Sequence, residues 1–230
     1  GKTLGGSSSI NAMLYVRGHR WDYDNWAALG NTGWSYDEVL PYFKRAENNE
    51  THRDSPSHGT GGPFNVAVLR SPSPINEAFH AAAAMRGVPR TADYNGAEQF
   101  GAFMYQVTQK NGERHSAAKG YITPNLSRPN LSVKTHALCS RVEFEGRRAR
   151  GEACSVGGKE MVVRARREVI LSSGAFGSPQ LLLLSGVGPA SELKQMGIPV
   201  LHDLAGVGRN LHDHIDHVQS WRTRTSDETF

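Results

Sequence analysis

The first seventeen residues, GKTLGGSSSINAMLYVR (residues 1–17), decide how the rest of the chain is interpreted. Two glycines, Gly5 and Gly6, precede three serines, and a largely apolar run follows them. Because glycine lacks a Cβ, the backbone of this turn can lie close against a flat or charged ligand. Backbone N–H groups in such a turn, followed by a helix start, form a concavity that binds anions. A solvated Gly/Ser linker is the alternative, although linkers seldom lead directly into an apolar run.

A second glycine-containing stretch, VILSSGAFGSPQLLLLSGVGP, occupies residues 169–189. It predicts a buried strand at residues 168–172, a glycine turn, and a helix whose first turn contains Pro179. The Gly-Val-Gly triplets at residues 186–188 and 206–208 are not dinucleotide fingerprints. The first follows a helix rather than a strand, and the second lacks the third glycine.

These two stretches resemble, in the same order, the two signatures of the glucose–methanol–choline (GMC) family of flavin oxidoreductases. The resemblance extends from residue 1 to about residue 217. In that family the first signature wraps the isoalloxazine ring and the pyrophosphate of FAD, and the second approaches its nucleotide end. Cys139 stands where the family has a valine whose backbone meets the adenine. The resemblance therefore implies the following FAD-binding residues: Gly5, Gly6, Ser7, Asn11, Ala12, Met13, Leu14, Cys139, Gly174 and Ala175.

Some members of the family attach FAD covalently through a histidine immediately before the motif asparagine. In this chain Ile10 stands at that position, directly before Asn11. An isoleucine side chain cannot form that bond. The resemblance therefore implies that FAD is held noncovalently.

The resemblance also implies an α/β fold in which a GMC-type FAD-binding domain is interleaved with an α+β substrate domain. We assign residues 1–48 and 125–213 to the FAD-binding domain, and residues 60–122 and 214–230 to the substrate domain. We expect both domains to be incomplete, as in an internal fragment. The family's dinucleotide fingerprint and its catalytic histidine would then lie outside residues 1–230. No residue here is assigned as catalytic, and we expect the fragment to be inactive alone.

The implied reaction is FAD-dependent oxidation of a primary alcohol, choline-like or other, to an aldehyde. A base takes the hydroxyl proton while a hydride passes to flavin N5. Taken as a whole, the sequence most resembles bacterial choline-dehydrogenase-type members. The family also contains lyases and a photodecarboxylase, so a non-redox member is one alternative and a non-catalytic flavin-binding remnant is another. The sequence does not predict the electron acceptor.

The composition is that of an ordinary folded protein with a mild net charge of +4. Arginines cluster between residues 141 and 167 without the interleaved aromatics typical of nucleic-acid binding, so we interpret them as solvated strand edges. No apolar run approaches the roughly 18 residues of a membrane helix. We expect a bacterial protein of the cytoplasm or of a membrane periphery. Cys139 and Cys154 give no disulfide framework, although a single disulfide stays possible.

Local signals place most of the other elements. A capping box, Ser35-x-x-Glu38, starts one helix, and Asn111-Gly112 is the strongest hairpin turn. The predicted helices are residues 22–29, 36–47 and 74–85, and the predicted strands include residues 62–66, 100–108, 131–135, 139–145, 149–156 and 160–166.

We expect no metal site. His52 and His58 lie in residues 47–62, which we expect to be a solvated and mobile loop without cysteine or carboxylate ligands at suitable spacing. His212, His214 and His217 resemble a family segment with a structural and cofactor-side role, although with Asp213 and Asp216 they could also suggest a metal cluster.

Overall fold

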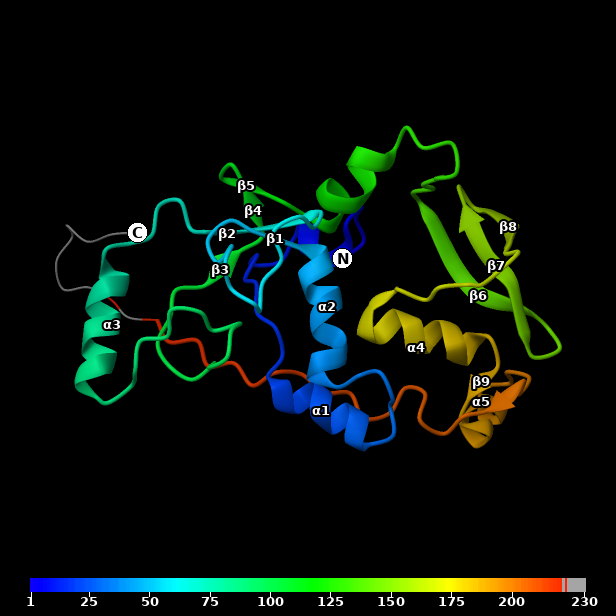
Figure 1. Ribbon diagram of the computed structural model, residues 1–230. Helices are drawn as coiled ribbons and strands as arrows, with labels where there is room; N and C mark the ends of the chain where they lie inside the picture. The colour runs from blue at the N-terminus through cyan, green and yellow to red at the C-terminus, as the bar shows by residue number, and fades with distance from the viewer. Residues whose placement is uncertain (221, 223–230) are drawn as a thin grey trace. The chain divides into compact units, whose positions relative to one another are not determined.

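The computed structural model describes residues 1–220 and 222 of the chain (Figure 1). Its contacts divide these residues into two compact units, one formed by Gly1–Ser132 and one that begins at Val133. Both units mix helices with strands, in keeping with the predicted α/β class. The assignment of residues 1–48 and 125–213 to a cofactor domain joins parts of both units and stays a prediction.

The first unit is organised around a small three-stranded sheet. The strand β2 (Phe64–Val68) lies in the middle, parallel to β1 (Glu47–Asn49) and antiparallel to β3 (Gln106–Val107). A second hairpin, β4 (Gln109–Lys110) and β5 (Glu113–Arg114), follows directly. The helices are α1 (Arg20–Ala28), α2 (Tyr36–Ala46) and α3 (Ile75–Met85), and shorter helical turns lie at Gly6–Ser9 (η1), Ala118–Ile122 (η2) and Thr123–Asn125 (η3).

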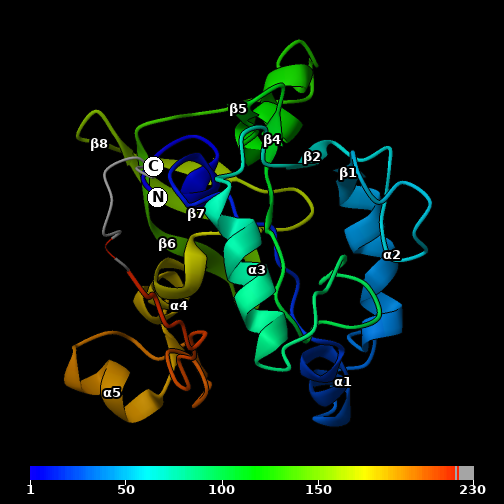
Figure 2. The ribbon, with the colours of Figure 1, turned by 90° about the vertical axis from the view of Figure 1, so that its left-hand side faces the viewer.

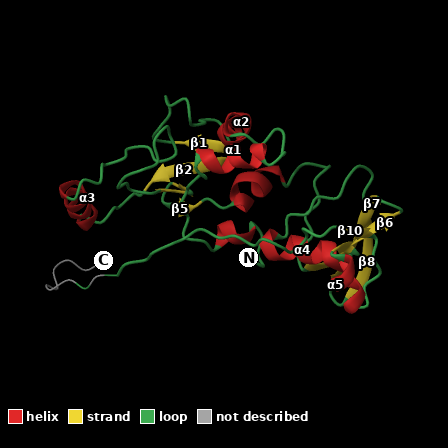
Figure 3. Ribbon diagram, turned by 90° about the horizontal axis from the view of Figure 1, so that it is seen from below, coloured by secondary structure: helices red, strands yellow, loops and turns green. Residues whose placement is uncertain are grey.

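Helix α2 begins where its sequence predicts. The capping box is formed, because the side chain of Glu38 accepts a hydrogen bond from the backbone N–H of Ser35 (3.1 Å). The helix buries Tyr36 and Val39 and contacts α1 near its own start (Figure 2). It then runs directly into β1 (Figure 3), so one continuous stretch delivers Glu47 to the sheet.

The expectation of a solvated loop at residues 47–62 is wrong for Glu47–Asn49, which form a strand, and for His58 and Gly59, which are buried, whereas most of residues 50–57 are an exposed loop. Glu47 and Asn49 are fully buried, and His58 is only 3% exposed. The stretch includes β1, and Gly59 packs so closely that an added Cβ would overlap the backbone of Lys44. The polar composition of this stretch suggested solvent exposure, but these polar side chains are hydrogen-bonded to one another in the interior.

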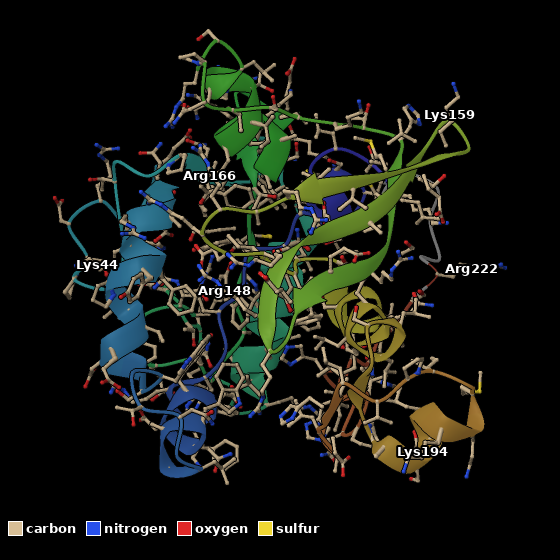
Figure 4. The ribbon with its side chains drawn as sticks, turned by 90° about the vertical axis from the view of Figure 1, so that its right-hand side faces the viewer. Lys44, Arg148, Lys159, Arg166, Lys194 and Arg222 are labelled. Atoms are coloured by element: carbon tan, nitrogen blue, oxygen red, sulfur yellow. The ribbon has the colours of Figure 1, made fainter. Side chains whose placement is uncertain are left out.

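The second unit begins with an antiparallel meander of β6 (Ala137–Glu145), β7 (Arg148–Val156) and β8 (Lys159–Arg164). The turns fall at Gly146 and at Gly157-Gly158, all with positive φ, as the sequence predicts. Figure 4 shows Lys159 where β8 leaves the second of these turns. The remaining elements are α4 (Gly174–Leu184), α5 (Ala190–Gln195) and the short parallel pair β9 (Val187–Gly188) and β10 (His202–Asp203).

Three predicted strands differ from the structure. Residues 131–135 and 168–172 form no strand, and residues 100–108 are strand only at Gln106–Val107. An extended segment becomes a strand only when a neighbour satisfies its backbone groups, and none of the described strands pairs with residues 168–172. Ile170, predicted to be buried, is accordingly 75% exposed. Helix α4 starts at Gly174, so Pro179 lies inside it rather than in its first turn.

None of the helices within the described part of the chain is both long enough and apolar enough to cross a membrane.

Candidate functional site

The Gly-Ser turn (residues 5–9) is a tight backbone loop in the first unit. Gly5 and Gly6 have φ angles of 90° and 59°, in the left-handed region that favours glycine. The N–H of Gly6 donates to the carbonyl of Thr3 (2.9 Å), and Gly6–Ser9 form the 3₁₀ turn η1. The two glycines are therefore required by the backbone itself, which a flexible linker would not need.

The two glycines face different surroundings. A Cβ added at Gly5 would lie 2.5 Å from Ser9 Oγ and 3.1 Å from the Cβ of Ala118, so the chain itself fills that side. A Cβ added at Gly6 would meet no atom of the described residues within 4 Å. The turn thus rests on the protein at Gly5 and leaves an open face at Gly6, which fits the close approach of a flat or charged ligand.

The three serines of the turn also differ in their roles. Ser8 Oγ donates to the carbonyl of Gly5 (2.5 Å) and accepts from the N–H of Ala117 (2.9 Å). Ser9 Oγ donates to the carbonyl of Leu4 (2.8 Å). These two hydroxyls hold the turn together, whereas Ser7 is exposed. Of the three, Ser7 is therefore the serine that can offer its hydroxyl to a ligand.

The segment after the turn is strained and firmly held. Met13 has a φ of 64°, which is unusual for a residue with a long side chain. Its N–H donates to Asn11 Oδ1 (3.0 Å), and its carbonyl accepts from the N–H of Thr108 (2.9 Å). Leu14 then forms an antiparallel bridge with Val107. The two predicted cofactor residues Met13 and Leu14 are thus fixed against the sheet.

The next residues continue this attachment into the interior. The N–H of Tyr15 donates to the carbonyl of Gln106 (2.9 Å). The carbonyl of Tyr15 accepts from the hydroxyl of Tyr94 (2.7 Å) and from the amide of Asn95 (3.0 Å). Asn95 Oδ1 in turn accepts from the N–H of Arg17 (2.8 Å). The first seventeen residues therefore run from an open turn to a buried anchor.

That anchor is a cluster of buried charges at the base of the segment. The guanidinium of Arg17 pairs with Glu47 (2.5 Å), and Glu47 also accepts from His58 Nδ1 (2.9 Å). The other imidazole nitrogen, Nε2, lies 2.9 Å from Asp93. Burial alone would raise the pKa of Glu47, but hydrogen bonds from His58 and Asn49 and the charge of Arg17 hold it below its usual range.

Sequence reasoning missed this charged cluster. Glu47 and His58 lie in one polar stretch, residues 47–62, and Asp93 lies in another, and each stretch is typical of a solvated loop. One signal was available: Gly59 and Gly62 flank a short polar loop, and glycines so placed often mark a close approach of two backbones.

The remaining predicted cofactor residues lie in the second unit. Cys139 is on β6, directly opposite Cys154 on β7, and both thiols are free. Burial, together with the nearby Glu152 carboxylate, raises the pKa of Cys139 to about 11, so the thiol is protonated and unreactive at neutral pH. Gly174 and Ala175 form the exposed first turn of α4, and Gly174 has a φ of 86°.

Among residues 1–220 and 222, no three histidine, cysteine or acidic side chains come together in a way that could hold a metal ion. His58, considered in the sequence for a metal, instead uses both ring nitrogens on carboxylates. Residues 212–217 include the histidines of the possible second cluster, and they are exposed in the structure.

The chain is similar to known proteins over most of its length. Residues 1–216 match the family described as GMC oxidoreductase. The chain is 50% identical over 224 residues to an oxygen-dependent choline dehydrogenase of Pseudomonas putida, covering 94% of this chain and 39% of that protein. Among solved structures it resembles pyridoxine 4-oxidase from Mesorbium loti (TM-score 0.83, 34% identity, 90% of this chain and 41% of the other). It also resembles an FAD-dependent oxidoreductase from Chaetomium thermophilum (TM-score 0.84, 34% identity, 90% and 38%).

The family match covers residues 1–216, nearly the whole chain, and includes the Gly-Ser turn with its two left-handed glycines. The chain belongs to the GMC oxidoreductase family, whose members are FAD-dependent oxidoreductases that act on CH–OH donors. It spans about two fifths of the length of the curated relatives that it matches.

Proposed function

We propose that this protein binds FAD noncovalently at the Gly-Ser turn and oxidises a primary alcohol to an aldehyde. The observation that carries the proposal is the open face at Gly6, beside a turn that the protein holds at Gly5, Ser8 and Ser9. A backbone loop that is rigid on one side and empty on the other suits a flat cofactor. Family membership supplies the identity of that cofactor.

The residues proposed to contact FAD are those that the family resemblance implies. In the first unit, the backbone of Gly5 and Gly6, the hydroxyl of Ser7 and the segment Asn11–Leu14 would contact it. In the second unit, the backbone at Cys139 and the first turn of α4, with Gly174 and Ala175, would contact its nucleotide end. A helix N-terminus of this kind favours negative charge, which suits the anionic part of the cofactor.

FAD, when bound, supplies the electron acceptor for a hydride from the alcohol carbon. The contribution of this chain is to bind and orient. The fixed segment Met13–Leu14 would hold one side of the site in place, because its backbone is bonded to Thr108 and bridged to Val107. We assign no residue of the chain as the base that takes the hydroxyl proton.

A choline-like alcohol is the first substrate to test. The support for this choice is the 50% identity to an oxygen-dependent choline dehydrogenase, compared with 34% to a pyridoxine 4-oxidase. Both names describe oxidation of small molecules, but the two relatives differ in substrate. Family membership alone therefore does not identify the alcohol.

The experiment is anaerobic reduction of the bound flavin. The protein is expressed at the full length of its gene and purified with its flavin, oxygen is removed, and choline, pyridoxine and benzyl alcohol are added in separate samples. We expect the flavin absorbance to bleach with one of these alcohols, fastest with choline. A protein that carries FAD reducible by dithionite but by no alcohol would contradict the proposed reaction and favour a non-redox or non-catalytic member.

A further inference from the structure

Arg114 contacts Ser8 of the Gly-Ser turn, 106 positions earlier in the chain, and Asn11 just after the turn. It ends β5, and the hairpin pairs it with Gln109 of β4. The tight turn of this hairpin is Asn111-Gly112, and Arg70 donates to the carbonyl of Asn111 (3.2 Å). The guanidinium is therefore presented from a short hairpin that is itself held in place.

The guanidinium makes three hydrogen bonds, one to Ser8 of the Gly-Ser turn and two to Asn11 just after it. Its Nη1 donates to the carbonyl of Ser8 (3.0 Å) and to Asn11 Oδ1 (2.9 Å), and its Nη2 donates to the carbonyl of Asn11 (2.8 Å). Hydrogen bonds from a charged donor are stronger than neutral ones. Asn11 Oδ1 also accepts from the N–H of Met13, so Arg114 orients the amide that keeps Met13 in its left-handed conformation.

The residues that follow Arg114 also contact the Gly-Ser turn, at Ser8 and at Gly5. The N–H of Ala117 donates to Ser8 Oγ (2.9 Å), and Ala118 lies against Gly5, where an added Cβ would come within 3.1 Å. Ala118 begins the π-helical turn η2, a rare conformation that is frequent at functional sites. Residues 114–118 therefore form one continuous segment that contacts and supports the Gly-Ser turn.

The charge of Arg114 is not balanced by a carboxylate among the described residues. The neighbouring Glu113 pairs instead with Lys119 (2.8 Å), and no ion pair of the described chain includes Arg114. A positive charge at the turn attracts an anionic ligand. It also favours the reduced state of a bound flavin, because reduction adds negative charge to the ring.

We propose that Arg114 is a positioning residue that presets the Gly-Ser turn for FAD and raises the midpoint potential of the bound flavin. The inference rests on the proposed function, since it assumes that FAD occupies the open face at Gly6. It adds a residue outside both sequence signatures, and it assigns that residue two separable effects, one geometric and one electrostatic.

The test compares three variants of the purified protein: Arg114→Met, Arg114→Lys and the control Arg128→Met. Arg128 is an exposed arginine whose side chain, among the described residues, bonds only to Asn130. FAD is removed and titrated back, and the midpoint potential of the flavin is measured. We expect Arg114→Met to weaken FAD binding at least about tenfold, as loss of charged hydrogen bonds predicts, and to lower the midpoint potential. Arg114→Lys keeps the charge but not the forked contact, so it should recover the potential more fully than the affinity.

The outcomes separate the inference from the proposed function. Unchanged FAD affinity and unchanged potential in Arg114→Met would overturn the inference, while wild-type protein that still binds FAD would leave the proposed function in place. Wild-type protein that binds no FAD would contradict both. If Arg114→Met is insoluble, Arg114→Lys decides: weakened FAD binding with a potential near that of the wild type supports the inference, and wild-type affinity overturns it.

Discussion

Nδ1 of His58 lies 2.9 Å from Oε1 of Glu47, and both side chains are fully buried. On the opposite side of the ring, Nε2 lies 2.9 Å from Oδ1 of Asp93. An imidazole can donate from both nitrogens only when it is protonated. Burial alone would lower the pKa of His58, but the hydrogen bonds and charges of Asp93 and Glu47 outweigh it and raise the pKa to about 9.

Stability should therefore depend on pH in a defined direction. The imidazole has its ordinary pKa of 6.5 in the unfolded chain and about 9 in the folded chain. The stabilisation is complete below the lower value and is lost as the pH rises through the higher one. We expect the unfolding temperature of the wild type to fall across this window, and to fall less in His58→Gln. Thermal unfolding followed by circular dichroism measures both.

The matched control is His212→Gln, because His212 is exposed in the second unit. It should keep the wild-type pH dependence. An equal fall of the unfolding temperature in wild type and His58→Gln would show that His58 is not held protonated.

At acid pH the dependence of stability on pH has the opposite direction. The pKa of Glu47 and that of Asp93 are lowered in the fold, so stability is lost as the pH falls through those lowered values.

Removing the buried partner of Glu47 should be far more costly than removing an exposed ion pair. Arg17 and Glu47 are 3% and 0% exposed at their side chains, whereas Arg20 and Asp37 are 52% and 76% exposed. Breaking a buried pair costs about 3–5 kcal/mol, while an exposed pair contributes about 0–1 kcal/mol. Arg17→Met should therefore lower the free energy of unfolding in urea several times more than Arg20→Met does. Equal losses in the two variants would contradict the burial of this pair.

The parts of the fold that depend on local chemistry could be predicted from the sequence. The capping box at Ser35 and Glu38 and the Asn111-Gly112 turn are formed as expected, because both are decided by residues within four positions of one another. The contact of Arg114 with Asn11 could not be predicted, since the two residues are 103 positions apart and no motif joins them. The pairing of Glu47 with His58 was missed for a different reason: the two residues are 11 positions apart, but their polar stretch was interpreted as solvated.

The prediction of a strand at residues 168–172 relied too heavily on their apolar character. Residues 168–172 have the composition of a buried strand, but a strand is specified by its neighbours as well as by its own residues. The backbone conformation of the predicted cofactor residues could be anticipated better, because the two signatures specify glycines at positions of the backbone that need them. Gly5 and Gly6 adopt the left-handed conformations that such a motif requires, although contact with FAD stays a prediction.

The flavin should be released without breaking a covalent bond. Ile10, at the position where some relatives carry the linking histidine, has an aliphatic side chain that is 68% exposed. Precipitation of the holoprotein with acid should leave the yellow flavin in the supernatant, where chromatography identifies it as FAD. Flavin that stays in the washed protein pellet would contradict noncovalent binding and would require an attachment site other than Ile10.

The position of the cofactor is tested most directly by the flavin content of Gly6→Val. Gly146→Val is its control, because Gly146 has nearly the same φ (57° against 59°), open space around it, and a place on the β6–β7 turn in the other unit. Both variants place a valine at nearly the same left-handed φ, so a difference between them reports on the ligand face. We expect soluble protein from both, with a wild-type flavin-to-protein ratio in Gly146→Val and little flavin in Gly6→Val. A wild-type ratio in Gly6→Val would show that FAD binds elsewhere and would contradict the account.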